Sequence, residues 1–571
     1  MLAGLALRLV NIDHGLPFVY QPDEAGHFTN RAVGMFGSDL DPGYFRNPSA
    51  FTYAIHLLLR AQYGALALVD GPRNVVRDCR SDPSAIYLTG RVLATVLCML
   101  SVMAVYAVGR RLWSAAEGLT AAALLAFAFL PVAYSRFALT DVGALLPVTI
   151  AVYGAVRAQE TGRLAYFALA GAAVGLAVGF KYTAGLLVAP LVAASLLTTA
   201  RRRTALLGLA IAAAVGLIAF LLTNPFFVLR FGDAIDQLSI QTVTAHRPKL
   251  GQRNEYGAVF YLRSLTWALG WGATLAAGAG ALWELRRSKS RAIVLIVFPL
   301  LLFALLSTAE RFFARWLMPA FPVLALLAGV ALTRVATHVA SRPGLQRAAL
   351  TALLAAVLAQ PLAADVRTAV LLGRTDTREM TWAFLVRTQP YRARVVVEPA
   401  IPMRVIRTWL TPGFGAPPRS EQPAPAAARF VRSRRPALID LYRASGHCVI
   451  VSFGSVRRRL ESHPLPKAQA YYRRLESESS VIFETNPYRS GGGRPPFDLD
   501  QTLWLYYPPS FERPGPEAIV YRLDHCRAAH GAPQTAVVAR AARTPQSPDR
   551  LARIARPVRG RAASALCRGG T

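Results

Sequence analysis

Residues 164–200 read LAYFALAGAAVGLAVGF-K-YTAGLLVAPLVAASLLTTA, two apolar runs joined through a single lysine, Lys181. Each run is close to the roughly 20 apolar residues that a helix needs to cross a bilayer. Within a membrane, helices are the simplest way for a chain to satisfy all its backbone groups. The stretch therefore predicts two membrane helices joined by a short turn that holds a cation at the membrane surface.

Apolar runs of the same kind recur along the first two thirds of the chain. They lie at 85–109, 115–134, 138–156, 204–222, 258–283, 292–308, 314–333 and 347–364. The chain has 571 residues, of which 53% are hydrophobic, and this composition excludes an ordinary soluble enzyme. Residues 1–12 resemble the outer end of one more helix but are too few to span at about 1.5 Å per residue. We therefore expect an upstream start or an incomplete first helix.

The basic residues predict how these helices cross the membrane. The formal net charge is +32, and many of the arginines fall in short turns between apolar runs. Such clustering is typical of cytoplasmic turns. The turns fall on one side only if the apolar run 51–69 does not cross, so we interpret 51–69 as an interfacial helix. The prediction is about eleven spans, with the N-terminus inside and the C-terminus outside. No nucleic-acid motif is present, so we expect no nucleic-acid partner.

The remainder of the chain is more polar and predicts a second domain. We expect a transmembrane domain over 1–366, whose first external loop is 13–84, and an extracytoplasmic α/β domain over 367–530. The strands expected in that domain are 394–398, 448–453, 502–507 and 518–521. Residues 413–427 read as loop, and the basic tail 531–571 as disordered. Cys448 and Cys526 could form a disulfide outside the cytoplasm, but the sequence does not fix their distance.

The first external loop carries the main candidate site, in the sequence Tyr20-Gln-Pro-Asp-Glu-Ala-Gly-His-Phe28. It places two adjacent carboxylates, Asp23 and Glu24, and the imidazole of His27 just after an apolar run. Ionisable groups at a membrane edge are costly and are often functional. Asp after Pro, with Glu in the first turn, is also typical of a helix cap. A capping loop can carry a catalytic acid as well, so the two interpretations are compatible.

Further ionisable residues fall in the predicted external turns, where the positive-inside rule favours none. They are Arg136, Asp141, Lys181, His246, Arg311 and Arg315. Taken singly, each has an ordinary explanation, such as ion pairing, snorkelling or lipid contact. Taken together, they predict chemistry on an anionic, lipid-anchored substrate. Lysine and arginine would hold a phosphate, while a carboxylate deprotonates an acceptor hydroxyl.

With these motifs the sequence resembles the GT-C class of polytopic glycosyltransferases. It is most similar to the bacterial branch related to protein O-mannosyltransferases and the lipid A aminoarabinose transferase. The motifs that carry the resemblance are Gln21-Pro-Asp-Glu24, Leu139-Thr-Asp141, Phe180-Lys-Tyr-Thr-Ala-Gly185, Arg315 to Pro319 with Pro322, and the segment from Asp376-Thr-Arg378 to Arg513-Pro-Gly-Pro516.

The resemblance implies roles for individual residues. Asp23 would be the catalytic base with Glu24 in support, Asp141 the second acid, and Lys181 a contact to the donor phosphate. Arg315 lies in a matching motif and would bind the same phosphate. Arg311 is a further candidate for binding the donor phosphate, suggested by its position, and His246, His27 and Arg136 are other candidates.

The predicted function is an integral membrane glycosyltransferase of the cell envelope. It would pass a sugar from a polyprenyl-phosphate donor to an extracytoplasmic protein, glycan or lipid acceptor. Membrane lipids are its other expected partners. Asp23, Glu24 and His246 could hold a divalent cation, but we expect no obligate metal or cofactor. The alternative is a flippase or transporter for a lipid-linked sugar, which would place its ionisable residues near the bilayer midplane. A scaffold anchored by its spans is a third possibility.

Overall fold

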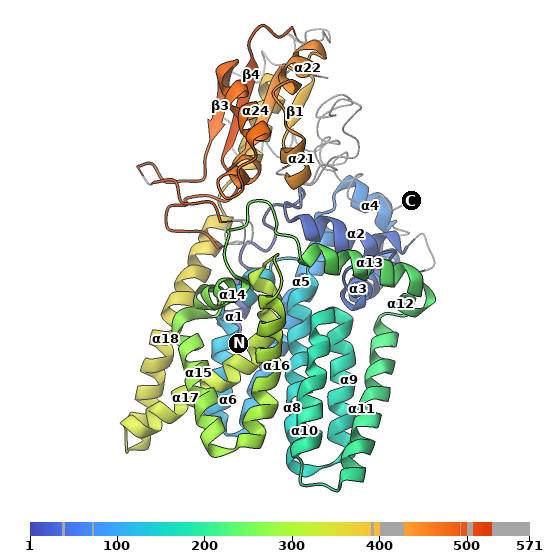
Figure 1. Cartoon of the computed structure of the whole chain (residues 1–571), viewed down its shortest axis with the longest axis vertical. Coiled ribbons are helices and arrows are strands. Elements are labelled where there is room, and N and C mark those ends of the chain that lie inside the picture. The colour runs from blue at the N-terminus through green and yellow to red at the C-terminus, as the bar shows by residue number, and fades with distance from the viewer. Residues whose placement is uncertain are drawn as a thin grey trace.

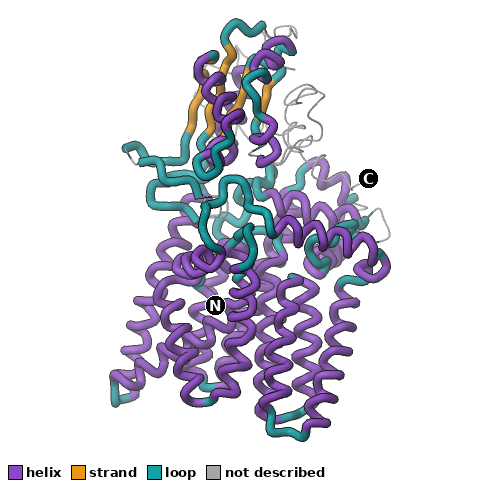
Figure 2. Tube along the Cα trace, viewed as in Figure 1, coloured by secondary structure: helices purple, strands orange, loops and turns teal. Residues whose placement is uncertain are grey.

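The computed structural model describes residues 1–36, 40–70, 74–389, 393–399, 427–491, 493–498 and 506–527. A bundle of long helices forms one part of the molecule, and a small sheet with its own helices stands over one end of that bundle (Figure 1). Figure 2 shows that the strands are confined to this upper part. The two parts form the framework on which the candidate site is built.

Helices occupy every range in which the sequence predicts an internal span. They are α5 Ser84–Leu112, α6 Ala115–Ala126 with α7 Phe129–Tyr134, η2 Thr140–Ala144 with α8 Leu145–Thr161, α9 Leu164–Phe180, η3 Tyr182–Leu187 with α10 Val188–Leu197, α11 Arg202–Thr223, α14 Gly257–Leu265 with η4 Thr266–Gly270 and α15 Trp271–Arg287, α16 Lys289–Ser307, η5 Ala314–Trp316 and η6 Met318–Ala320 with α17 Phe321–Val339, and α18 Pro343–Leu372.

Six helical stretches in the described residues are long and apolar enough to cross a membrane, and three shorter apolar helices accompany them. The short ones are α6, α9 and η3 with α10. The chain is therefore a multi-pass membrane protein, and the count of about eleven crossings stays a prediction. The basic turn at Arg201–Arg203 joins α10 to α11 at the end of the bundle opposite the sheet (Figure 1).

Helices α9 and α11 pack through glycine. A Cβ atom at Gly171 would collide with the carbonyl oxygen of Ala212, and one at Gly175 with that of Gly216. Only a residue without a side chain permits this approach of two helix backbones, as at other small-residue interfaces in membranes. The contact holds the helical hairpin 164–200 against the next span.

Helices outside the predicted spans gather at the end of the bundle that faces the sheet (Figure 1). They are α2 Thr29–Gly34, α3 Ala50–Asp70, α4 Val75–Ser81, α12 Phe226–Leu229 and α13 Phe231–Ala245, with the short N-terminal helix α1 Leu2–Leu9 inside the bundle. Helix α3 covers the predicted run 51–69, and it exposes Leu57 and Leu58. Its predicted interfacial position stays a prediction, because no membrane accompanies the structure.

The sheet has the order β1-β2-β4-β3, in which β1 and β2 are parallel and the other pairs antiparallel. Its strands are β1 Val395–Val397, β2 Val449–Phe453, β3 Ser479–Thr485 and β4 Ala518–Leu523. Strands β1 and β2 fall in two predicted ranges, and β4 begins at the predicted residue 518 and extends two residues past the predicted end at 521. Strand β3 was not predicted, because its short apolar run, 481–483, is flanked by polar residues and burial along the strand is mixed.

The fourth predicted strand, 502–507, lies mostly outside the described residues, and its last two positions are loop. The predicted loop 413–427, apart from its last residue, and the predicted tail 531–571 also lie outside them. Helices α19 Thr377–Thr388, α21 Ala427–Ser433, α22 Leu438–Ala444, α23 Gly454–Arg457, η8 Arg458–Leu460 and α24 Pro466–Ser477 complete this part.

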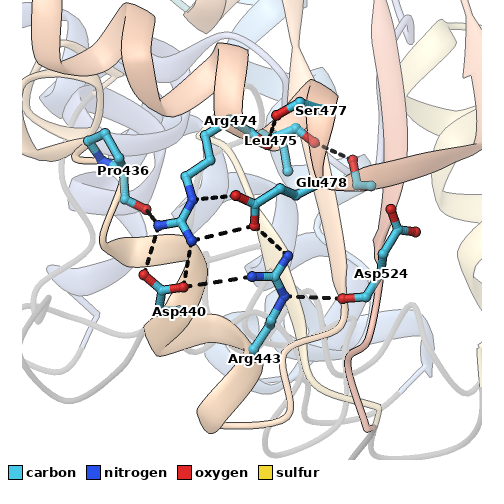
Figure 3. A network of polar contacts seen from close by, with 9 residues as sticks. Pro436, Asp440, Arg443, Arg474, Leu475, Ser477, Glu478 and Asp524 are labelled. Atoms are coloured by element: carbon cyan, nitrogen blue, oxygen red, sulfur yellow. Dashed lines mark hydrogen bonds and ion pairs between the residues drawn. The ribbon is translucent and has the colours of Figure 1, made fainter.

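A disulfide and a network of ion pairs link the elements of the sheet region. Cys448 and Cys526 form a disulfide between the start of β2 and the segment after β4. In Figure 3, Arg474 lies between Asp440 and Glu478, and Arg443 binds the same Glu478. The network joins α22 and α24 to the start of β3. Its members are solvent-accessible and Asp440 is exposed, so the individual ion pairs contribute little to stability.

Candidate active site

The first external loop is fixed by its buried glutamate. Glu24 has no exposed surface, and its two oxygens accept from Arg91 at 2.7 and 2.8 Å. The backbone N–H of Ala138 donates to the same carboxylate at 2.9 Å. Arg91 in turn donates to the carbonyl oxygens of Ile12 and His14. Glu24 therefore joins this loop to α5 and to the turn before η2, and in doing so positions Asp23.

Asp23 is the more exposed of the two acids. Its Oδ2 accepts a hydrogen bond from Nη2 of Arg315 at 2.6 Å, and its side chain is 25% exposed. The imidazole Nδ1 of His27 lies 3.8 Å from Oδ1 of Asp23. Burial alone would raise the pKa of Asp23, but the charge of Arg315, with His27 and Lys249, outweighs burial and lowers this pKa to about 2. Asp23 is therefore ionised throughout the physiological range.

A second acid forms a second ion pair beside the first. Oδ1 of Asp141 accepts from the Lys181 ammonium at 2.6 Å. The same ammonium donates to the backbone carbonyl of Arg315 at 3.2 Å. The two ion pairs are thus joined through one residue, because Arg315 binds Asp23 with its guanidinium and Lys181 with its carbonyl oxygen. We call Asp23, His27, Asp141, Lys181 and Arg315 the acid–base cluster.

Local breaks in the helices place these side chains. Lys181 has extended backbone at the end of α9, Asp141 lies in the 3-10 turn η2, and Arg315 lies in the 3-10 turn η5. The Thr140 hydroxyl donates to the carbonyl oxygen of Phe180 at 2.8 Å and so joins η2 to the Lys181 turn. Tight 3-10 turns often occupy helix ends. Here they bring together charged residues from three distant parts of the sequence.

One cation near the cluster was not chosen as a site residue from the sequence. Lys249 lies in the loop between α13 and α14, and its Nζ is 4.6 Å from the ring centroid of Phe313. Burial, together with the positive charges of Arg459, Arg315 and Arg311, lowers the pKa of Lys249 to about 7, although Asp23 opposes the shift. The sequence showed it only as one basic residue among several in a polar loop.

The loop that carries Lys249 is held from two directions. Nη1 of Arg459, in the sheet region, donates to the carbonyl oxygen of Leu250 at 2.9 Å. The Gln252 amide donates to the carbonyl oxygen of Glu310 at 2.8 Å and accepts from the N–H of Phe312 at 3.1 Å. The sheet region and the Arg315 turn therefore set the position of Lys249 together.

The remaining predicted site residues take no part in the two ion pairs. Arg136 is buried, donates to the carbonyl oxygen of Leu7, and lies near Asp365 and Arg8. His246 is exposed at the end of α13. Arg311 donates to the carbonyl oxygen of Arg247 at 3.4 Å, on the side of the loop that holds Lys249.

No group of three His, Cys, Asp or Glu side chains able to hold a metal occurs among the residues that the structure describes. The trio Asp23, Glu24 and His246, considered from the sequence, is not brought together, since Glu24 faces Arg91. That no metal is obligatory stays a prediction.

The arrangement suits an anionic ligand. Two carboxylates, Asp23 and Asp141, face three cations, Lys181, Lys249 and Arg315. Burial lowers the pKa of His27, and with His27 neutral the group has a positive excess while Lys249 is protonated. Arginine and lysine are the side chains that hold phosphate groups. A carboxylate beside them can take a proton from a hydroxyl.

Comparison with known proteins gives a family match over part of the chain. The family model described as dolichyl-phosphate-mannose-protein mannosyltransferase matches residues 87–228. That range contains most of α5 and all of α6 to α11, with Asp141 and Lys181. A search of curated protein sequences gives no match.

Solved structures are similar over more of the chain. The match to the archaeal oligosaccharyltransferase AglB from Archaeoglobus fulgidus, in complex with an inhibitory peptide and a dolichol-phosphate, covers 91% of this chain and 87% of that one, with a TM-score of 0.53 and 13% identity. The match to ArnT from Cupriavidus metallidurans, bound to undecaprenyl phosphate, covers 68% and 71%, with a TM-score of 0.44 and 16% identity. The match to the Pmt1-Pmt2 complex of S. cerevisiae covers 41% and 33%, with a TM-score of 0.29 and 19% identity.

The family model covers the helices that position the second ion pair, and the AglB likeness covers nearly the whole chain. Both agree with the resemblance drawn from the sequence motifs. The chain is thus a multi-pass membrane protein similar to the GT-C glycosyltransferases, and it has their fold.

Proposed function

We propose that this protein transfers a sugar from a polyprenyl-phosphate donor to an acceptor on the outer side of the membrane. The observation that carries the proposal is the pair of acids, Asp23 and Asp141, each bound to a cation of the kind that holds phosphate. The AglB structure, whose fold this chain shares, contains a dolichol-phosphate. A lipid phosphate bound beside the acid–base cluster is consistent with the positive charge that Lys249 adds next to it.

In this proposal the donor phosphate lies among Lys181, Lys249 and Arg315. The acceptor oxygen attacks the anomeric carbon while the bond from that carbon to the phosphate oxygen breaks. Asp23 takes the proton of the acceptor hydroxyl, and the lipid phosphate leaves with the bonding electrons. The three cations stabilise the charge that develops on the leaving phosphate.

Arg315 links donor binding to the basicity of Asp23. With a pKa of about 2, Asp23 is a weak base while Arg315 is bound to it. A general base works best when its pKa lies nearer the working pH. A donor phosphate that draws the Arg315 guanidinium away raises the pKa of Asp23 and so makes it a stronger base. Asp23 is thus held inactive until the donor is present.

The same proposal includes the side of the membrane on which the acceptor binds. The sheet region, 367–530 in the predicted division, lies outside the cytoplasm together with the acid–base cluster. The disulfide between Cys448 and Cys526 supports this side, because disulfides persist mainly in oxidising compartments. The sugar and the acceptor (protein, cell-wall glycan or lipid) are what the assay below is designed to identify.

The test is transfer from radiolabelled polyprenyl-phosphate sugars in membranes that contain this protein, compared with Asp23→Asn. Asn keeps the shape of the side chain and removes the base, so we expect transfer to fall about 100-fold or more. Asp236→Asn is the matched control, since Asp236 is exposed on α13 and its carboxylate makes no ion pair within the described residues.

Equal transfer by wild type and Asp23→Asn, at equal protein levels, would remove Asp23 from the chemistry. Movement of the labelled lipid across the membrane without transfer would favour the flippase alternative. One observation agrees with that alternative, since Arg8, Arg136 and Asp365 form a buried ionisable group within the helical bundle. Such groups within membranes often mark transport pathways.

A further inference from the structure

A second candidate site lies in the sheet region, at the carboxyl ends of the two parallel strands. A pocket of about 310 Å³ opens beside α23, η8 and α24. Strand β1 ends next to Glu398, and β2 ends at Phe453, whose N–H donates to the Glu398 carboxylate at 2.7 Å. Tyr472, which lines the pocket, donates to the other oxygen of Glu398 at 2.7 Å. Crevices at the carboxyl ends of parallel strands are common ligand sites.

The lining of this pocket is strongly basic. It contains the guanidinium groups of Arg457, Arg458, Arg473 and Arg494 and only two carboxylates, Glu461 and Glu476. The lining residues therefore carry two more positive than negative charges. Guanidinium groups match the geometry of carboxylates and phosphates, since their planar donors bind two oxygens at once.

Most of the lining arginines are already held by carboxylates. Arg457 donates to Glu476 at 2.8 Å, Arg458 to Glu461 at 2.7 Å, and Arg494 to Glu517 at 2.6 Å. These pairs fix the guanidinium groups around the pocket.

Arg473 differs from the other three. Its side chain is exposed, and its guanidinium makes no hydrogen bond or ion pair within the described residues. One lining cation is therefore available for a ligand.

The pocket also offers groups that bind hydroxyls. The two lining carboxylates are partly exposed and are acceptors only, and Gln469 adds an amide. A volume near 310 Å³ is at the small end of ligand pockets. The chemistry matches a small molecule with both an anionic group and hydroxyl groups.

We propose that this pocket binds an acidic sugar, that is, a monosaccharide unit that carries a carboxylate or a phosphate. The anionic group contacts Arg473, and the hydroxyls contact the lining carboxylates and the Gln469 amide. The unit is free or part of a longer glycan, because the pocket is open to solvent on one side. The proposal concerns binding alone and does not rest on the proposed sugar transfer.

The pocket lies next to the loop that carries Lys249. Arg457 and Arg458 line the pocket, while the next residue, Arg459, donates to the carbonyl oxygen of Leu250. His463, four residues after Arg459, accepts from the N–H of Gly251 at 3.4 Å. One short segment therefore separates an acidic sugar in the pocket from the candidate active site.

The experiment is calorimetric binding to the full-length protein in detergent. The probes are galacturonic acid, glucose 6-phosphate, inorganic phosphate and glucose. We expect galacturonic acid or glucose 6-phosphate to bind at least tenfold more tightly than glucose and than inorganic phosphate. Arg473→Glu should weaken that binding at least tenfold, because it reverses the one available charge without breaking an ion pair.

Arg522→Glu is the matched control, with the same charge change at an exposed position of β4 outside the pocket. It should bind as the wild type does. Hydrogen exchange should slow within 457–476 when the acidic sugar is present. Binding of glucose as tight as that of the acidic sugars, equal binding by Arg473→Glu and wild type, or no binding at all would overturn the proposal.

Discussion

At the scale of single residues, Arg315 decides how the two acids of the site behave. Its guanidinium binds Asp23 and its carbonyl oxygen binds Lys181, which in turn binds Asp141. One residue thus contacts both halves of the acid–base cluster. A substitution at residue 315 removes the charge that binds Asp23 but keeps the backbone carbonyl that binds Lys181.

Arg315→Gln should change the pH profile of transfer. Arg315 is the main group that lowers the pKa of Asp23, so its loss lets burial raise this pKa from about 2. Asp23 is a base only when ionised, so activity should disappear at a higher pH on the acid side than in the wild type. The measurement is kcat/KM against pH with a fixed donor. An acid limb at the wild-type position would show that Arg315 does not control Asp23.

Glu24 has a different role from its neighbour. Glu24→Gln leaves the Arg91 charge buried without its partner, and breaking a buried pair in this way typically costs about 3–5 kcal/mol. We expect the free energy of unfolding in detergent to fall by about that amount. Replacing both residues, Glu24→Gln with Arg91→Met, should recover part of the loss. Glu484→Gln, at an exposed position of β3, should change stability by less than about 0.5 kcal/mol.

At the scale of elements, the site depends on where helices break. Asp141, Lys181 and Arg315 lie in or beside 3-10 turns, at the ends of apolar runs that the sequence displays clearly. The apolar runs and the ionisable residues in the external turns were therefore predictable from the sequence. Asp23, Asp141 and Lys181 could be named as candidate site residues in this way. The partner of each charge was not, because pairing depends on loop conformations that have no sequence period.

Lys249, in the loop between α13 and α14, is a residue whose surroundings could not be predicted from the sequence. Lys249 titrates near neutral pH, since its pKa is lowered to about 7, and its amine is protonated below that pH and neutral above it. If it contacts the donor phosphate, the KM for the donor should rise as the pH increases through 7. In Lys249→Met the KM should be high at every pH, while Lys467→Met, exposed on α24, should behave like the wild type. A KM that rises equally with pH in Lys249→Met would exclude this role.

At the scale of the whole molecule, charge and covalent chemistry both support the proposed orientation. The acid–base cluster and the disulfide-linked sheet region lie at one end of the bundle, and the basic turn 201–203 at the other (Figure 1). Hydropathy and arginine positions predicted this arrangement, because both follow from the cost of placing charge in a membrane. Strand β3 and the order of the sheet could not be predicted in the same way, since β3 is only partly buried, whereas the other edge strand, β1, is a buried apolar run.

The orientation can be measured by labelling single introduced cysteines with a reagent that does not cross membranes. Ser477→Cys, exposed on α24, should react in sealed right-side-out vesicles. Arg287→Cys, exposed at the end of α15, should react only after the vesicles are opened. The opposite pattern would place the sheet region in the cytoplasm and overturn the proposed side of the reaction.

The bond from Arg459 to Leu250 has a consequence for protein engineering. The sheet region could be treated as a separate domain and exchanged between related proteins. However, its Arg459 binds Leu250, in the loop of the membrane part that carries Lys249. A chimera that keeps one side of this contact and replaces the other would present Lys249 in a different place. Residues 249–252 and 457–463 should therefore be inherited together in any hybrid, as a single unit of design.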